Sequence, residues 1–421
     1  MSAEKTTLEN GVRILTRKMP HARSVSLGVW VETGARDENP AESGLSHFIE
    51  HMIFKGTARR TSFQIAREFD SIGGQTNAFT SLEATCYHAR VMDAHLATMV
   101  DILSDIFLSP VFDPLEVERE RAVIFQEIGM TEDSPEEYIH VLSESAFWGD
   151  HAMGRPITGT RENILGFSAA DIRNFFHRLY HPERIVIAAS GNLEHNRIVD
   201  LIGPAFASVQ KQNSFPNRTK PQGRSGVFLH PRDTEQVHIC METDGLSATD
   251  PRRYAASLMN TILGGNMSSR LFQEIREQRG LAYSVYSFLS SYTDTGVSGI
   301  YAGTSADTAA EAVDLILSNL KKLKNTPVDT SELRDAGEYT KGSLMLAAES
   351  VDNQMVRLAQ NEIHLGCHQS LEEIIAEMEA VTAEDIMGLA QELYRSDPMT
   401  ITLLGPVSDP ALFEDLLIRQ G

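Results

Sequence analysis

The sequence predicts an α+β protein made of two similar α/β halves, each a mainly antiparallel sheet packed with helices. Three observations lead to this prediction: a length of 421 residues, strand and helix signals that recur in the same order, and a polar break near the middle. The break spans residues 207–225. We therefore expect an N-terminal domain at 1–210, a linker at 211–224 and a C-terminal domain at 225–421.

The two halves read as copies of one structural unit. In each half a strand and a turn precede a helix, a Gly-Gly pair follows, and alternating strand-like segments lead to an amphipathic helix. These landmarks are the strands and turns at 25–41 and 237–253, the pairs at 73–74 and 264–265, and the helices at 94–108 and 308–323. A duplicated α+β unit accounts for this order.

The first helix is expected to begin at Asn39 and Pro40, with Glu42 three residues beyond Asn39, and to end near Gly56. A set of apolar residues at helical spacing would form its buried face. These residues are Leu45, Phe48, Ile49, Met52 and Ile53.

The same helix carries an HxxEH motif, the inverse of the commoner HExxH. His47 and His51 are four residues apart, so both imidazoles project from one side of the helix and can bind one metal ion. Glu50 shares that edge but cannot easily act as a ligand beside its neighbour His51. We expect Glu50 to be the general base that deprotonates a water molecule.

A catalytic zinc ion needs a third protein ligand besides two imidazoles. The segment 113–133 supplies a candidate, on a helix whose start is marked by Asp113 and Pro114. Glu120 and Glu127 are seven residues apart, which is about two helical turns, so they share one face. Glu127 would complete a His2Glu site with a fourth position for water, and Glu120 would orient a ligand histidine.

A simpler interpretation of these residues stays open. A chance HxxEH is expected in about one chain of this size in a hundred, and Glu127 taken alone is more typical of a solvated helix face. The other motifs of the chain decide between the two interpretations, and together they favour the metal site.

The composition excludes some classes of partner. The chain has 37 Lys+Arg against 58 Asp+Glu, a formal net charge of −21, whereas nucleic-acid binders normally present a basic surface. The acidic balance suits a basic substrate, although a well-solvated acidic surface explains it equally well.

The cysteines and the N-terminal segment bear on the compartment. Cys86, Cys240 and Cys367 lie far apart and form no CxxC pair, so neither a disulfide framework nor a Cys-rich zinc site is expected. The N-terminal segment is polar, and no run of about 18 apolar residues occurs. We expect a cytoplasmic protein with no signal peptide and no membrane span.

The chain resembles the pitrilysin/insulinase superfamily of zinc metallopeptidases. The resemblance rests on HFIEH at 47–51, on Glu127 with Glu120 seven residues before it, and on SRLFQEIREQRGLAYSVYSF at 269–288. It covers essentially the whole chain. In size and motif the chain is most similar to bacterial processing-peptidase-like proteins and to the catalytic (beta) subunit of the mitochondrial processing peptidase.

The resemblance implies a clamshell fold in which two chains, here a homodimer, enclose a chamber. It implies one Zn²⁺ per chain, because the second half has no HxxEH motif. It also implies an arginine and a tyrosine, seven residues apart in the second half, that reach the substrate. These correspond to Arg276, which would hold a substrate carbonyl or steady the closed state, and Tyr283, which would donate a hydrogen bond to the oxyanion. Without the resemblance they look like a surface charge and a strand core residue.

The segment 73–81 resembles the edge strand on which the family's substrates lie. Asn77, Ala78 and Phe79 would pair with an extended peptide as an additional strand. Backbone pairing of this kind selects extended conformation rather than sequence. An ordinary hairpin strand is an equally good interpretation of the residues themselves.

We expect a zinc-dependent endopeptidase that hydrolyses unstructured peptides or presequence-like segments. A non-catalytic core or scaffold subunit of the same fold is the alternative, as is a catalytic chain that needs a different partner chain. Scaffold members of the superfamily typically lose the metal ligands. The presence of His47, Glu50, His51 and Glu127 therefore favours the enzyme.

Overall fold

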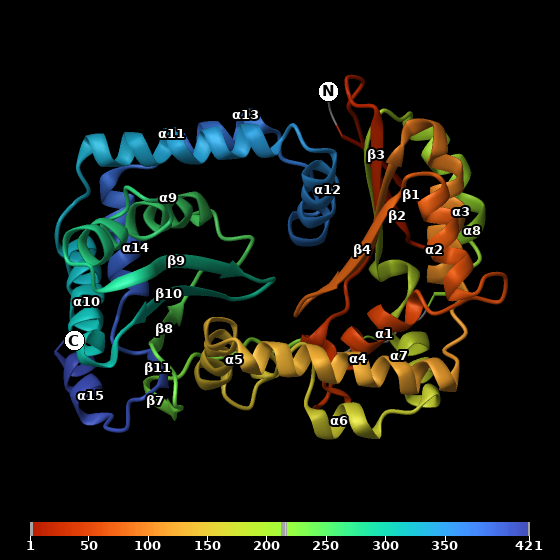
Figure 1. Ribbon diagram of the computed structural model, residues 1–421. Coiled ribbons are helices and arrows are strands. Elements are labelled where there is room, and N and C mark those ends of the chain that lie inside the picture. The colour runs from red at the N-terminus through yellow and green to blue at the C-terminus, as the bar shows by residue number, and fades with distance from the viewer. Residues whose placement is uncertain (1–2, 212–214, 216, 420–421) are drawn as a thin grey trace. The chain divides into compact units, whose positions relative to one another are not determined.

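The computed structural model describes residues 3–211, 215 and 217–419, which form two compact units. The first unit combines Met1–Ile128, Arg155–Thr219 and Met345–Ser370, and the second combines Gly129–Gly154, Lys220–Leu344 and Leu371–Gly421. Each unit has one sheet (Figure 1). Each also has its own hydrophobic core.

The first unit is built on a six-stranded sheet with the order β1-β2-β6-β3-β5-β4. Neighbouring strands are antiparallel, except for the parallel pair β2 and β6. The strands are β1 Glu4–Thr7, β2 Arg13–Lys18, β3 Ser24–Val31, β4 Gln75–Thr80, β5 Thr85–Met92 and β6 Ile185–Gly191. The helices are α1 Leu45–Ile53, α2 Ser62–Ser71, α3 Leu96–Leu108, α4 Pro114–Asp133, α6 Arg161–Gly166, α7 Ala169–Leu179, α8 His195–Phe206 and α12 Val351–Leu365.

The second unit has a five-stranded sheet with the order β7-β11-β8-β10-β9, in which only β7 and β11 are parallel. Its strands are β7 Gly226–Pro231, β8 Val237–Asp244, β9 Ala282–Ser291, β10 Gly296–Thr304 and β11 Met399–Gly405. Its helices are α5 Pro135–Trp148, α9 Arg253–Leu263, the π-helix η6 Phe272–Gln278, α10 Ala309–Asn325, α11 Thr330–Ala347, α13 Leu371–Glu379, α14 Ala383–Leu393 and α15 Ala411–Ile418. Short 3-10 turns across both units are η1 Ala35–Asp37, η2 Pro40–Glu42, η3 Asp93–His95, η4 Ala152–Gly154, η5 Pro182–Arg184 and η7 Ala306–Thr308.

The two sheets share one topology. The order β2-β6-β3-β5-β4 of the first corresponds to β7-β11-β8-β10-β9 of the second, with the parallel pair in the same place. In both units the middle strand leads to a helix, and the edge strand β4 or β9 precedes its inner neighbour along the chain. The predicted α+β class and the two similar halves are therefore confirmed.

Strand β3 explains why the first sheet is covered on both faces. Val25, Leu27 and Val29 point into the core formed with the helices, whereas Trp30 lies in a second cluster with residues of α12. The close approach of α12 requires a glycine on that face: a Cβ at Gly28 would lie 2.7 Å from the sulfur of Met355. A strand that is apolar on both faces needs a cover on both faces.

The helices that cover the second face are exchanged between the sequence halves. Helix α12, which follows the second sheet's first four strands along the chain, packs on β2, β3 and β6 of the first unit. Helix α5, which precedes the linker, packs on β8 and β11 of the second. The compact units thus differ from the contiguous domains predicted at 1–210 and 225–421. Tertiary burial of the second sheet face, which local periodicity does not report, is the physical reason.

The described part of the predicted linker, residues 211, 215 and 217–224, contains no helix or strand, and β7 begins at Gly226. Residues 212–214 and 216 of that prediction lie outside the described residues. None of the described helices combines the length and the apolarity that crossing a bilayer requires.

Candidate metal centre

Helix α1 presents its polar edge to a cavity because its apolar face is fixed in the core. Phe48, Ile49 and Met52 are fully buried there. The helix begins later than predicted, at Leu45, since Gly44 before it adopts a left-handed conformation with φ 101°. This φ range favours glycine and interrupts the helix.

The predicted helix start therefore needs a correction. Asn39 caps the short turn η2, where its side chain accepts a hydrogen bond from the Ala41 N–H. Helix α1 is instead capped by Glu38, whose carboxylate accepts hydrogen bonds from the backbone N–H groups of Gly44 at 2.8 Å and Ser46 at 2.7 Å. These hydrogen bonds satisfy N–H groups that the start of a helix leaves unpaired, while burial raises the pKa of Glu38 to about 8.

Helix α4 supplies the opposing side of the site. It begins at Pro114 as predicted, and the Asp113 carboxylate accepts a hydrogen bond from the N–H of Leu115 at 2.8 Å. Glu120 and Glu127, two turns apart, both face α1. The spacing argument for a shared helix face thus holds.

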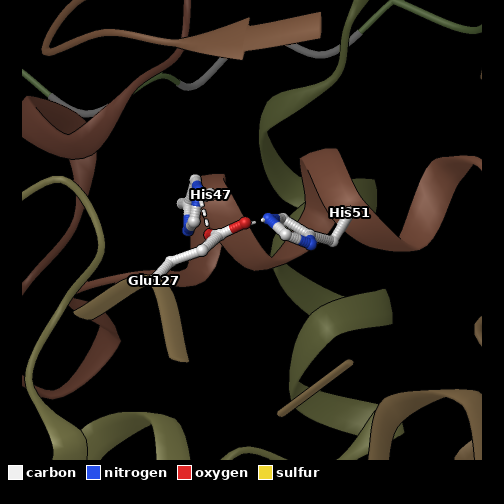
Figure 2. Close-up of side chains that lie close together, drawn as sticks. All are labelled: His47, His51 and Glu127. Atoms are coloured by element: carbon white, nitrogen blue, oxygen red, sulfur yellow. Dashed lines mark ion pairs between the residues drawn. The ribbon is translucent and has the colours of Figure 1, made fainter. Parts of the chain in front are cut away.

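His47, His51 and Glu127 converge. The Nε2 atoms of His47 and His51 lie 3.5 Å and 3.3 Å from Oε2 of Glu127. One potential ligand atom from each residue falls within 4.8 Å of the others, and Figure 2 shows the Glu127 carboxylate between the two imidazoles. Two imidazole nitrogens and one carboxylate oxygen are the donor set of a catalytic zinc site. These residues fit a zinc ion.

Glu120 lies behind His51 rather than beside the three converging atoms. Its Oε2 atom is 3.1 Å from Nδ1 of His51, and its Oε1 atom is 2.6 Å from Nζ of Lys55. The His51 Nδ1–H can donate to this carboxylate, which leaves Nε2 free to bind a metal. The hydrogen bonds from His51 and Lys55 outweigh burial and lower the pKa of Glu120.

The two histidines have different electrostatic surroundings. Burial, with a contribution from the charge of His51, lowers the pKa of His47 to about 4, so this imidazole is neutral near pH 7. Burial also acts to lower the pKa of His51, but the hydrogen bond to Glu120 and the charge of Glu127 raise it above its usual value. A proton and a metal ion would therefore compete for His51.

Glu50 lies at the same cavity and is held from the sheet. The hydroxyl of Thr80, at the end of β4, donates a hydrogen bond to its Oε2 atom at 2.6 Å. Burial raises the pKa of Glu50, opposed by this hydrogen bond. A carboxylate whose pKa is raised toward neutrality is better suited to accept and return a proton.

The cavity has a volume of about 390 Å³ and is open to solvent. It is lined by Glu50, His51, Phe54, Lys55, Thr76, Asn77, Ala78, Glu120 and Glu127. Strand β4 forms one wall, and it is the terminal strand of the sheet. Helix α1 contacts this strand close to one end (Figure 1).

The predicted substrate strand is only partly as expected. Asn77 and Ala78 line the cavity, but the Phe79 side chain packs on Trp30, with ring centroids 5.3 Å apart, and on His88 at 6.2 Å. Phe79 follows Ala78, and successive side chains of a strand point to opposite faces, so the Phe79 ring lies on the face opposite to the Ala78 side chain. Its backbone still belongs to the edge of the sheet.

Arg276 and Tyr283 belong to the second unit, whereas the converging histidines and glutamates belong to the first. Within their own unit the two residues stack: the Arg276 guanidinium lies 5.0 Å from the Tyr283 ring centroid and 4.6 Å from that of Phe272. Tyr283 is 79% exposed, which differs from a strand core residue.

Two residues of the site were not predicted, although periodicity pointed to both. Lys55 continues the spacing of His47 and His51, because it lies four residues after His51. Thr80 follows Ala78 by two residues, the period at which strand residues share a face.

Two family models match the chain. Residues 13–161 match the model described as insulinase (peptidase family M16), and residues 166–338 match the model described as peptidase M16 inactive domain. The name of the second model agrees with the absence of a second group of converging His, Cys, Asp or Glu ligands among the described residues.

Relatives match over nearly the full length. An uncharacterized zinc protease of Bacillus subtilis, YmxG, is 42% identical to this chain. The aligned region covers 96% of this chain and 98% of the YmxG chain. An uncharacterized zinc protease of Streptomyces coelicolor is 36% identical over 97% of this chain and 90% of its own.

Solved structures share the fold. The crystal structure of a protease from Helicobacter pylori has a TM-score of 0.91 at 21% identity and covers 96% of this chain and 99% of its own. A crystal structure of a peptidase M16 inactive domain from Pseudomonas fluorescens has a TM-score of 0.90 at 20% identity. The match covers 97% of this chain and 98% of that one.

Proposed function

This chain belongs to the insulinase family, peptidase family M16, and on that premise we propose that it is a zinc-dependent endopeptidase. The observation that carries the proposal is the convergence of His47, His51 and Glu127. Of these, His51 and Glu127 line, together with Glu50, a cavity walled by an edge strand. Its relatives carry the name zinc protease, which supports the same activity.

His47, His51 and Glu127 would hold one Zn²⁺ per chain. When bound, zinc supplies Lewis-acid activation of water and of the scissile carbonyl. The donor atoms present, two imidazole Nε2 atoms and a carboxylate, are those that zinc accepts while keeping one position open. Glu120 supports this role by accepting the other ring N–H of His51.

Glu50 performs the proton transfers of peptide hydrolysis. Its carboxylate accepts a proton from the attacking water and later delivers it to the leaving amine. The hydroxyl of Thr80 keeps one carboxylate oxygen oriented by its 2.6 Å hydrogen bond. The raised pKa of Glu50, caused by burial, suits a group that must both take and return a proton near neutral pH.

The substrate lies along β4 as an additional strand. The edge position of β4 and the lining of the cavity by Asn77 and Ala78 support this binding mode. Backbone pairing requires an extended peptide, so the substrates are unstructured segments or presequence-like peptides. The formal net charge of −21 favours basic peptides over acidic ones at low ionic strength.

The family resemblance adds the parts that act around this site. Two copies of the chain form a homodimer around a closed chamber in the cytoplasm. Within that chamber, Arg276 holds a substrate carbonyl and Tyr283 donates a hydrogen bond to the oxyanion. The exposure of Tyr283 and its stacking against Arg276 leave both side chains available for such contacts.

The experiment is cleavage of a long, unstructured, basic peptide that carries a quenched fluorophore. Wild-type chain is compared with chelated chain, with zinc-restored chain and with Glu50→Gln. Activity lost on chelation, restored by zinc and absent in Glu50→Gln is expected, with one zinc per chain by elemental analysis.

Two other outcomes identify the alternatives. Bound zinc without cleavage would indicate a catalytic chain that needs a different partner, which light scattering after gel filtration would test as monomer against dimer. Neither zinc nor cleavage would contradict the proposal and favour a scaffold subunit.

A further inference from the structure

Lys55 reaches His51 through the carboxylate of Glu120, and all three residues line the cavity. Its Nζ atom lies 2.6 Å from Oε1 of Glu120, and Oε2 of Glu120 lies 3.1 Å from Nδ1 of His51. We propose that Lys55 is a positioning residue: it fixes the Glu120 carboxylate, and through it the His51 imidazole, for metal binding. This inference rests on the proposed zinc site.

The loop that carries Lys55 is anchored independently of the site. Gly56 and Thr57, the next two residues, form β-bridges with Thr61 and Pro110. The hydroxyl of Thr57 also donates a 2.8 Å hydrogen bond to Asp105. Lys55 is thus presented to Glu120 from a fixed backbone, which a positioning role requires.

Burial explains why Glu120 needs a cation. Its side chain is 7% exposed, and a carboxylate removed from water is costly unless it is paired and hydrogen-bonded. With Lys55 and His51 as partners, each oxygen has one donor. Without Lys55 one oxygen loses its donor and the carboxylate loses its counter-charge, so it would turn toward water and away from His51.

The two ligand histidines are not equally supported. Nδ1 of His47 is buried and has no hydrogen-bond partner within the described part of the chain, whereas Nδ1 of His51 contacts Glu120. The orientation of His51 is therefore the one that the protein controls through a second residue. Partners of this kind typically change metal affinity by about 10- to 100-fold.

The test is zinc affinity, measured by competition with a chromophoric chelator. Lys55→Met, which keeps an unbranched side chain one atom shorter and removes the charge, is expected to weaken zinc binding about tenfold. Lys55→Arg, which keeps the charge, should stay within about threefold of wild type. Lys18→Met is the matched control, because Lys18 pairs with Glu194 on the surface of the same unit.

A double-mutant cycle tests whether Lys55 acts through Glu120. If it does, Lys55→Met adds almost nothing to the loss of affinity caused by Glu120→Gln. Excess zinc should also restore the cleavage activity of Lys55→Met, which a purely structural defect would not allow.

Three results would overturn the inference. Lys55→Met could bind zinc with wild-type affinity, Lys55→Met and Lys55→Arg could lose equal zinc affinity, or the losses from Lys55→Met and Glu120→Gln could be fully additive. Failure of the wild-type chain to bind zinc would instead refute the proposed function. The two failures are therefore distinguishable.

Discussion

The two units place the same pair of helices together but put different side chains at the contact. In the first unit, α1 and α4 meet with His51 Nε2 3.3 Å from a Glu127 oxygen. In the second, α9 and α11 occupy the same places in the element order and meet at Thr261 and Thr340, whose hydroxyl oxygens are 3.2 Å apart. The fold thus supplies the position, and a few side chains supply the chemistry.

The edge strands repeat this lesson. By strand register, Thr80 of β4 and Ser287 of β9 hold corresponding positions, each facing the helix after the middle strand. Thr80 donates to the Glu50 carboxylate at 2.6 Å, whereas Ser287 donates to the backbone carbonyl of Asn260 at 3.0 Å. One hydroxyl therefore orients a titratable group, and the other only joins a strand to a helix.

The largest loss of zinc binding and cleavage is expected when His51 of α1 is replaced by threonine, the residue type at the contact of α9 with α11. His51→Thr removes one of two imidazole ligands and should abolish stoichiometric zinc binding, with cleavage reduced by about three orders of magnitude or more. Elemental analysis and peptide cleavage measure both. Thr261→Val is the matched control and should leave both unchanged. Full zinc occupancy in His51→Thr would contradict the assignment of His51.

The next effect concerns the hydroxyl that orients Glu50. Thr80→Val keeps the shape of the side chain but removes a hydrogen bond to a charged group, worth about 1.5–3 kcal/mol. We expect kcat to fall about tenfold or more while zinc content stays at the wild-type level. Ser287→Ala, the corresponding change in β9, should alter kcat much less. Equal losses in both variants would mean that the two hydroxyls are equivalent.

The sequence predicted the parts of the site that depend on local periodicity. His47, Glu50 and His51 lie within one helix, and Glu127 shares a face with Glu120 in another, so spacing alone indicated their directions. The zinc donor set then linked the two helices.

The missed features depend on structure beyond one element. Lys55 lies two residues past the end of α1, and its role depends on a contact with Glu120 of another helix, which spacing within one helix does not report. Phe79 was grouped with Ala78 by position in the strand, but alternation puts its ring on the opposite face, against Trp30. The capping role of Glu38 followed from the left-handed Gly44, which the sequence allowed but did not require.

The exchanged helices could not be predicted, and they yield a test of the units themselves. Met355 on α12 is fully buried against the first sheet. Met355→Ala is expected to cost about 2–5 kcal/mol and to destabilise the first unit, although the residue lies after the linker in sequence. Hydrogen exchange should rise in β3 and β6 more than in β8. Met267→Ala is the control, because Met267 is 72% exposed.

The smallest effect concerns the pH dependence of stability at two corresponding glutamates, Glu32 just after β3 and Glu242 within β8. Glu32 pairs with Arg13, whereas Glu242 is 2% exposed and its Oε2 atom has no hydrogen-bond partner among the described residues. Burial, together with the charge of Glu144, raises the pKa of Glu242 from 4.5 to about 8. The folded state therefore binds more protons than the unfolded state between these values, and stability falls as pH rises through that window.

Glu242→Gln removes the ionisation and should flatten this pH dependence. The melting temperature of the variant should exceed that of wild type by more near about pH 8.5 than near about pH 5, because only the carboxylate acquires a buried charge as pH rises. Glu32→Gln, the matched change in the first unit, removes a paired charge and should give no such gain. A gain in Glu242→Gln that is independent of pH would mean that packing, and not ionisation, distinguishes the two positions.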